Sequence, residues 1–167
     1  MLGGEALTKT ERTISRDIPN IAEILGPILR RLPAAERPLL GALAERLAAE
    51  RYRGWAAATT DAAWRAALLA CAAREDDIAR RVEALYPDAA ETERRILREN
   101  PDLEQLNRAL FAGRPESEQY AIQAAAERVG ASTWRAAAAQ APPAARETFL
   151  ACAELEEESA HVLESRG

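Results

Sequence analysis

The chain has 167 residues, of which 48% are hydrophobic and 29% are charged, and its formal net charge is −5. This composition is typical of one globular domain whose core needs no disulfide or structural metal. The acidic balance argues against nucleic-acid and anionic-membrane partners, because both require a basic face. No segment reaches the roughly 20 apolar residues of a spanning helix, and residues 1–17 lack the apolar block of a secretory signal. We therefore expect a cytoplasmic protein.

Helix formers dominate the sequence and β-branched residues are scarce, which predicts an all-α protein. Breakers and caps divide the chain into one short helix and four long ones, over residues 18–31, 34–59, 62–86, 117–140 and 143–165. A crossover over residues 87–116 is predicted to hold two further short helices. The chain is therefore expected to contain an N-terminal segment, 1–33, and a helical bundle, 34–165.

Local signals predict where several of these helices begin. Asp61 is expected to be the N-cap of the second long helix. In the crossover, Asp88 and Glu91 have the spacing of a capping box. Asn100 is expected to cap a helix whose first residue is Pro101, a residue type that suits this position.

The two halves of the chain carry similar patterns. A shift of 82 positions places Glu45, Arg46, Tyr52 and Arg53 on Glu127, Arg128, Trp134 and Arg135. A shift of 81 positions places the run from Leu69 to Ala72 on the run from Leu150 to Ala153, and Glu75 on Glu156. The near-constant shift predicts a duplicated helical hairpin. Hairpins over 34–86 and 117–165 would then be joined by the crossover.

Two hairpins joined by a long crossover resemble the ferritin-like four-helix bundle. In that superfamily, which includes ferritins and rubrerythrins, the first and third helices each contribute one inward glutamate. The second and fourth each contribute a Glu-x-x-His pair, and these ligands hold two metal ions. The resemblance implies that Glu45 and Glu127 are the single glutamates. Each is followed seven residues later by an aromatic residue, Tyr52 or Trp134.

A helical-wheel count places Glu75 and Glu156 inside the apolar arcs of the second and fourth long helices. A carboxylate in such a position must be protonated, hydrogen-bonded, paired or bound to metal, because its isolated desolvation is costly. Glu45 and Glu127 are expected at the flanks of their arcs. The set of four glutamates is therefore the candidate site.

The histidines of the superfamily are missing. Ile78 and Ser159 stand three residues after Glu75 and Glu156, where histidines would be expected. The one Glu-x-x-His match, Glu158 with His161, faces outward in this register. An alternative register, shifted by about half a turn, would bring that pair inward.

Three interpretations of the glutamates stay open. They could hold iron, manganese, magnesium or calcium, since these ions accept hard oxygen donors. They could pair with arginines in a salt-bridge layer at a degenerate metal site, the candidates being Arg46, Arg53, Arg128 and Arg135. They could also lie at exposed edges between helices.

Cys71 and Cys152 precede Glu75 and Glu156 by one helical turn, so the cysteines, with Tyr52 and Trp134, would line the same chamber. Small buried residues are the simpler interpretation of both cysteines, and redox groups or soft ligands are the other.

The missing histidines favour a ferritin-like binding or scaffolding module with a degenerate metal site. Such a module would act as a homodimer or bind a protein partner through an apolar helix face. The alternative is a carboxylate-bridged protein with two iron or manganese ions, for iron handling or oxidation. An apolar stripe on the N-terminal helix could cap the bundle or dock a partner.

Overall fold

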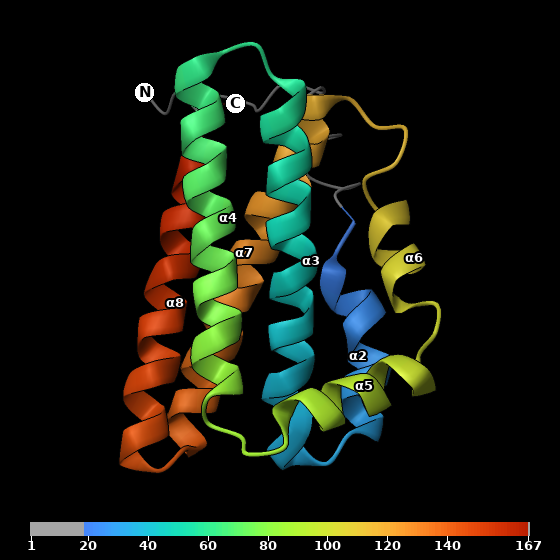
Figure 1. Ribbon diagram of the computed structural model, residues 1–167, viewed down its shortest axis with the longest axis vertical. Helices are drawn as coiled ribbons and strands as arrows, with labels where there is room; N and C mark the ends of the chain where they lie inside the picture. The colour runs from blue at the N-terminus through green and yellow to red at the C-terminus, as the bar shows by residue number, and fades with distance from the viewer. Residues whose placement is uncertain (1–18, 167) are drawn as a thin grey trace, which may run out of the picture.

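The computed structural model describes residues 19–166, and within them every regular element is a helix, which confirms the predicted all-α class. Four long helices run side by side (Figure 1): α3 (Arg37–Ala58), α4 (Ala62–Glu83), α7 (Glu116–Gln140) and α8 (Pro143–Glu164). The shorter helices are α2 (Ile21–Arg31), the 3-10 turn η1 (Ala34–Glu36), α5 (Ala89–Glu99) and α6 (Leu103–Ala109). The expectations for residues 1–17, and for a helix starting at residue 18, fall on residues that are not described.

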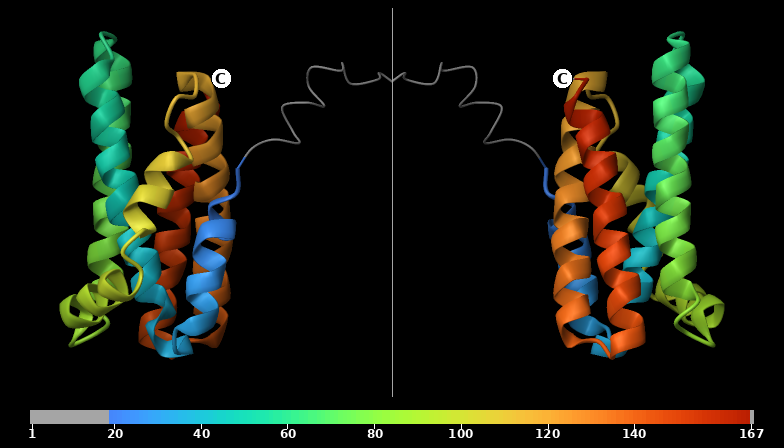
Figure 2. Two further views of the ribbon diagram at one scale, coloured as in Figure 1. Left: turned by 90° about the vertical axis from the view of Figure 1, so that its right-hand side faces the viewer. Right: turned by 90° about the vertical axis from the view of Figure 1, so that its left-hand side faces the viewer.

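The long helices form two antiparallel pairs, α3 with α4 and α7 with α8, and α4 packs against α8. Helices α5 and α6 lead from the end where α4 finishes to the opposite end, where α7 begins (Figures 1 and 2). As a result, α3 and α8 run in one direction, and α4 and α7 in the other. Each long helix therefore presents one face to a common interior.

The ends of the helices follow the sequence signals in part. Asp61 caps α4, because its side chain accepts a hydrogen bond of 3.0 Å from the amide of Trp64. Asp88 stands at the predicted N-cap position of α5, but its side chain makes no cap hydrogen bond, so the capping box does not form. The prediction for Asn100 is also wrong. This residue ends α5 and donates to the carbonyl of Ile96, and α6 begins later, at Leu103.

The apolar stripe of α2 is covered within the chain. Ile28 is buried together with Leu40 of α3 and Ile96 of α5, and Ile24 and Leu25 pack against the same cluster. Helix α2 also contacts α6 and α7, so it covers the side of the bundle between the two hairpins (Figure 2). This packing favours the capping interpretation of the stripe. No helix among residues 19–166 is long and apolar enough to cross a membrane.

Candidate metal centre

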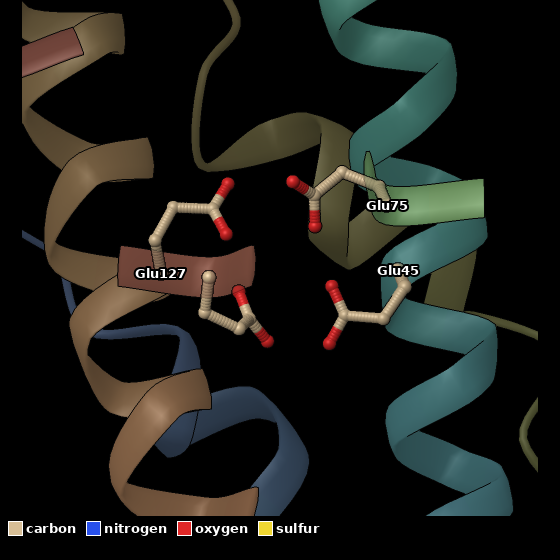
Figure 3. Close-up of side chains that lie close together, drawn as sticks. Glu45, Glu75 and Glu127 are labelled. Carbon is tan, nitrogen blue, oxygen red and sulfur yellow. The ribbon is translucent and has the colours of Figure 1, made fainter. Parts of the chain in front are cut away.

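Four glutamates, one from each long helix, meet in the interior. Figure 3 shows Glu45 and Glu75 facing Glu127 across the space between the hairpins. With Glu156 they offer four carboxylate oxygens that all lie within 4.8 Å of one another. The side chains are buried, with exposures of 8% for Glu45, 0% for Glu75 and 1% for the other two. The placement of Glu45 and Glu127 at the flanks of their arcs, and the exposed-edge interpretation, are therefore wrong.

The carboxylate of Glu127 is held by two neutral donors. Tyr52 Oη donates to Glu127 Oε1 at 2.8 Å, and Gln123 Nε2 donates to the same oxygen at 2.6 Å. Gln123 is held in turn by Arg51, whose Nη1 donates to Gln123 Oε1 at 2.5 Å. The Arg51 guanidinium stacks on Phe111, 3.7 Å from the ring centroid, and burial lowers its pKa to about 10. The half-buried Arg51 thus orients the amide of Gln123 and makes no ion pair with the glutamates.

The glutamates of α4 and α8 have one donor each. Trp134 Nε1 donates to Glu156 Oε1 at 2.8 Å, and Ser159 Oγ donates to Glu75 Oε1 at 2.7 Å. The second oxygen of Glu75 is buried and has no hydrogen-bond partner. A buried carboxylate oxygen without a hydrogen-bond partner is costly. It marks a position where a further ligand of the carboxylates would be stabilising.

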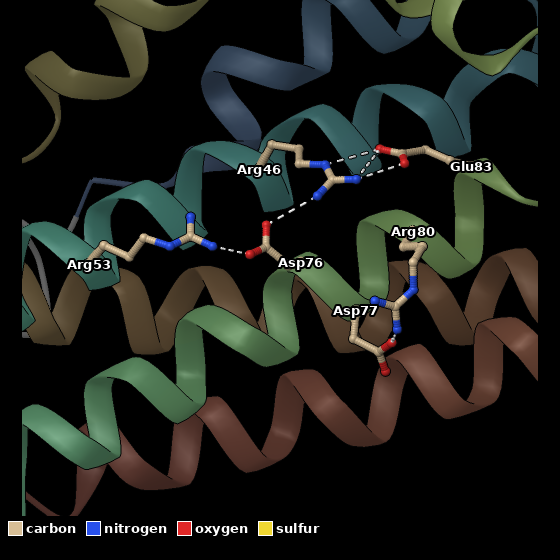
Figure 4. Close-up of polar contacts among 6 residues, drawn as sticks. All are labelled: Arg46, Arg53, Asp76, Asp77, Arg80 and Glu83. Atoms are coloured by element: carbon tan, nitrogen blue, oxygen red, sulfur yellow. Dashed lines mark hydrogen bonds and ion pairs between the residues drawn. The ribbon is translucent and has the colours of Figure 1, made fainter.

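Two arginines of α3, Arg46 and Arg53, reach toward carboxylates of α4 (Figure 4). Arg46 pairs with Glu83 at 2.8 Å and with Asp76 at 3.2 Å. Arg53 pairs with the other oxygen of Asp76. These carboxylates lie at the edge between α3 and α4, where the ion pairs are partly solvated and each contributes little to stability.

The second hairpin repeats the arrangement. Arg128 pairs with Glu164 at 2.7 Å, and Arg135 pairs with Glu157 at 2.7 Å. Within residues 19–166, no ion pair involves any of the four interior glutamates. The expected salt-bridge layer is therefore wrong, because all four candidate arginines have other partners nearer the surface.

Burial changes the acidity of three of the four glutamates. Burial raises the pKa of Glu75 and of Glu156 well above the ordinary value, and it raises the pKa of Glu45 to about 7. The negative charge of Glu127 adds to the increase at Glu45 and Glu75. Without a bound cation, the cluster therefore retains protons at neutral pH.

The alternative helical register is wrong. Glu158 and His161 are exposed on α8, and Glu158 pairs with Arg74 at 3.0 Å. Ile78 and Ser159 are fully buried beside the glutamates. Ser159 therefore supplies a hydroxyl where the resemblance implied an imidazole, and Ile78 supplies only apolar surface.

Cys71 and Cys152 are free and buried. Cys71 belongs to the same core cluster as Tyr52, and Cys152 to the same cluster as Trp134. Burial raises the pKa of both thiols, that of Cys152 to about 12. Because a thiolate is the form that binds metal or reacts, the structure favours the packing interpretation of both residues.

The donor set fits a hard cation. When each ligand oxygen lies about 2.0–2.6 Å from an ion, oxygens on that ion are up to ~4–5 Å apart, as these four are. The elevated pKa values of Glu45, Glu75 and Glu156 and the unpartnered oxygen of Glu75 indicate that the cluster lacks positive charge. Water would have to complete the coordination, since no histidine is present.

Sequence reasoning missed three residues of the site. Gln123 lies one turn before Glu127 on the same face of α7, a spacing that could have been noticed. Arg51 gave no signal, because its partners come from distant segments. Gly130 leaves room for Glu156, since a methyl group there would overlap its carboxyl group.

The elevated pKa values predict how the stability of the metal-free protein depends on pH. A carboxyl whose pKa is raised in the folded state stabilises that state below its unfolded pKa, and this contribution is lost as pH rises through the folded value. We expect the free energy of unfolding to fall from pH 5 to pH 8, through the pKa of about 7 of Glu45, by on the order of a few kcal/mol.

Chemical denaturation across this range, with chelator present, measures the effect. Glu93 also has its pKa raised to about 7, by burial in α5. The comparison is therefore made in a Glu93→Gln background. Replacing Glu45, Glu75 and Glu156 by glutamine should flatten the profile, and a parent profile that is already flat would contradict the assignment.

Gly130 provides a test of the space at the site. The Gly130→Ala methyl group would displace the Glu156 carboxyl, so we expect metal affinity to fall about 10- to 100-fold, as for other changes that misorient ligands. Gly54→Ala is the matched control, because nothing lies within 4 Å of its added methyl group. This control should bind metal normally and gain ~1 kcal/mol of stability. Isothermal titration calorimetry with manganese measures the metal affinity of the two variants, and equal affinities would refute the placement of Glu156.

Comparisons with protein families, with curated proteins and with solved structures give no match. The interpretation of the site therefore rests on its own residues. These are four buried carboxylates without an ion-pair partner, three of which accept hydrogen bonds from the hydroxyl, amide and indole groups of Tyr52, Ser159, Gln123 and Trp134.

Proposed function

We propose that this chain is a ferritin-like metalloprotein that binds two divalent ions of iron or manganese between Glu45, Glu75, Glu127 and Glu156. The observation that carries the proposal is the convergence of four buried carboxylates, within 4.8 Å, with no ion pair to any of them. Such a cluster is stable when metal replaces its protons.

Charge supports two ions. Four ionised carboxylates carry four negative charges, and two divalent cations neutralise them. A single divalent ion would balance only two of these charges, and the other two glutamates would have to stay protonated, so two ions are the occupancy that replaces every proton. Oxygen ligands alone are compatible with iron, manganese, magnesium or calcium. The ferritin-like arrangement is the reason for naming iron and manganese first.

That arrangement has independent support. The two hairpins are joined by a long crossover, and each hairpin contributes two glutamates to the centre. The ion pairs Arg46–Glu83 and Arg128–Glu164 stand at corresponding positions of the two halves. These features favour a duplicated hairpin with a centre between its copies.

Hydrogen bonds from neighbouring side chains would orient the ligand oxygens. Tyr52 and Gln123 fix one oxygen of Glu127 and leave the other free, and Trp134 does the same for Glu156. Ser159 fixes Glu75, with its second oxygen directed into the buried cluster. Such outer contacts orient ligands and tune their affinity. Bound iron or manganese would supply one-electron redox chemistry at this place.

The missing histidines favour a scaffolding module with a degenerate metal site, in which arginines were one way to neutralise the glutamates. Since those arginines pair elsewhere, a metal-free module would have to keep the buried acids protonated. The metal-binding proposal accounts for the same acids, so we favour it over a degenerate site.

Metal content tests the proposal directly. Protein purified without chelator or affinity metal, then dialysed against iron(II) without oxygen, should retain about two ions per chain by plasma mass spectrometry. The Glu75→Gln, Glu156→Gln double variant keeps shape and hydrogen bonding but loses two charges, and should retain almost none. The matched control is Glu158→Gln with His161→Ala, which changes the exposed pair and should bind normally. A wild type without metal would overturn the proposal.

A further inference from the structure

An open hollow of about 330 Å³ lies between α3, α6 and the start of α7. A volume of this size accommodates a small molecule. Its wall contains Glu50 and Arg51 of α3, Asn107 and Arg108 of α6, and Phe111 from the loop that follows α6. None of the four interior glutamates lines this hollow. It is therefore a place on the molecule distinct from the candidate metal centre.

The guanidinium of Arg51 is held in one position at this wall. It stacks on Phe111, Nη2 donates to Asn107 Oδ1, and Nη1 donates to Gln123 Oε1 at 2.5 Å. A guanidinium carries five N–H groups, and these hydrogen bonds use two of them. The remaining N–H groups, including that of Nε, have no acceptor among residues 19–166. The side chain therefore keeps several oriented donors for a further ligand.

The positive charge of Arg51 also lacks an ion-pair partner. Every other partly buried arginine between residues 19 and 166 forms an ion pair, namely Arg46, Arg74, Arg95 and Arg114. Burial lowers the pKa of Arg51 to about 10, although the charge of Glu127 acts in the opposite direction. Glu127 lies beyond the side chain of Gln123. The hollow therefore has a cation in its wall that no nearby anion neutralises.

The amide of Asn107 supplies another unused donor. This side chain is 2% exposed, and its Oδ1 accepts from Arg51, so Nδ2 points to the other side. In the described part of the chain, Nδ2 donates to no acceptor, although buried side-chain amides are usually hydrogen-bonded. A buried donor of this kind beside an unpaired guanidinium indicates a ligand that accepts hydrogen bonds and carries negative charge.

The other charged side chains of the wall are exposed. Arg108 contacts Glu104 only at 3.7 Å, so its charge adds to the attraction for an anion at the rim. Glu50 is exposed and forms no ion pair with any residue between 19 and 166. Because it stays solvated, its charge is largely screened and does not replace a partner for Arg51.

We propose that this hollow binds a small oxyanion, whose carboxylate or phosphate oxygens accept hydrogen bonds from Arg51 and Asn107. The site goes beyond the proposed function, because it requires no metal at the four glutamates. A guanidinium presents its N–H groups in pairs that match two oxygens of a carboxylate or a phosphate. A purely structural role explains why Arg51 contacts Phe111 and Gln123. It does not explain the unused donors and the unpaired charge.

Nuclear magnetic resonance titration of the metal-free, full-length chain tests the proposal. Protein labelled with nitrogen-15 is titrated at constant ionic strength, with inorganic phosphate in one series and with succinate in another. We expect the signals of Arg51 Nε–H and of the Asn107 side-chain amide to shift and to saturate at millimolar anion. Saturation with phosphate, with succinate or with both would support the site and identify the head group that it accepts.

Asn107→Asp separates anion binding from packing. The carboxylate has the shape of the amide, keeps the acceptor for Arg51 and gives this arginine an internal counter-charge, so the fold should be retained. Anion affinity should fall at least about 10-fold, because a donor is lost and a competing negative charge is added. Arg51→Gln removes the positive charge itself and should lower the affinity by a similar factor.

Arg98→Gln is the matched control for Asn107→Asp. It makes the same change in net charge, at an exposed residue of α5 that does not line the hollow, and should bind the anions as the wild type does. Shifts that saturate with neither anion would overturn the proposal. Equal affinities in the wild type and Asn107→Asp would also overturn it, because the anion would then bind elsewhere. Either result would leave the metal centre standing, since metal content is measured separately.

Discussion

The burial of four carboxylates in one small space is the constraint on which the rest of this structure depends. Ionised glutamate side chains with exposures of 8% or less are costly to bury without positive charge nearby. No arginine forms an ion pair with them, and burial raises the pKa values of Glu45, Glu75 and Glu156. Burying these acids destabilises the metal-free protein, and metal binding would remove that destabilisation.

The surrounding structure keeps this interior both closed and ordered. Each long helix contributes one glutamate, so the site exists only when both hairpins are assembled. Arginines that could have entered the interior are held at the edges by Asp76, Glu83, Glu157 and Glu164. Neutral donors occupy the contacts next to the carboxylates instead. These donors orient the oxygens without cancelling the charge that would attract a cation.

Much of this could be predicted from sequence. The inward direction of Glu75 and Glu156 followed from helical periodicity, because their helices carry clear apolar arcs. The same count failed for Glu45 and Glu127, because α3 and α7 separate their apolar and polar residues less clearly than α4 and α8 do. Burial there is decided by the facing hairpin. A periodicity count on one helix does not contain that information.

Other features of the site are contacts between side chains that come together only in the folded protein. The side chain of an arginine can reach several carboxylates, so the sequence does not predict whether Arg46 points inward or toward Glu83. The hydrogen bonds of Ser159 and Gln123 join positions that only packing brings together. Capping patterns did not always predict the cap hydrogen bond, which the side chain of Asp88 does not make. Local signals therefore located the helices better than they located the partners of the site.

Anomalous X-ray diffraction from crystals grown with iron(II) or manganese(II), recorded at the absorption edge of the metal, tests the central claim most directly. The account predicts two anomalous peaks enclosed by Glu45, Glu75, Glu127 and Glu156, with these carboxylates as the protein ligands. Crystals that show metal only at surface acids, with the four glutamates protonated and hydrogen-bonded to one another, would contradict it.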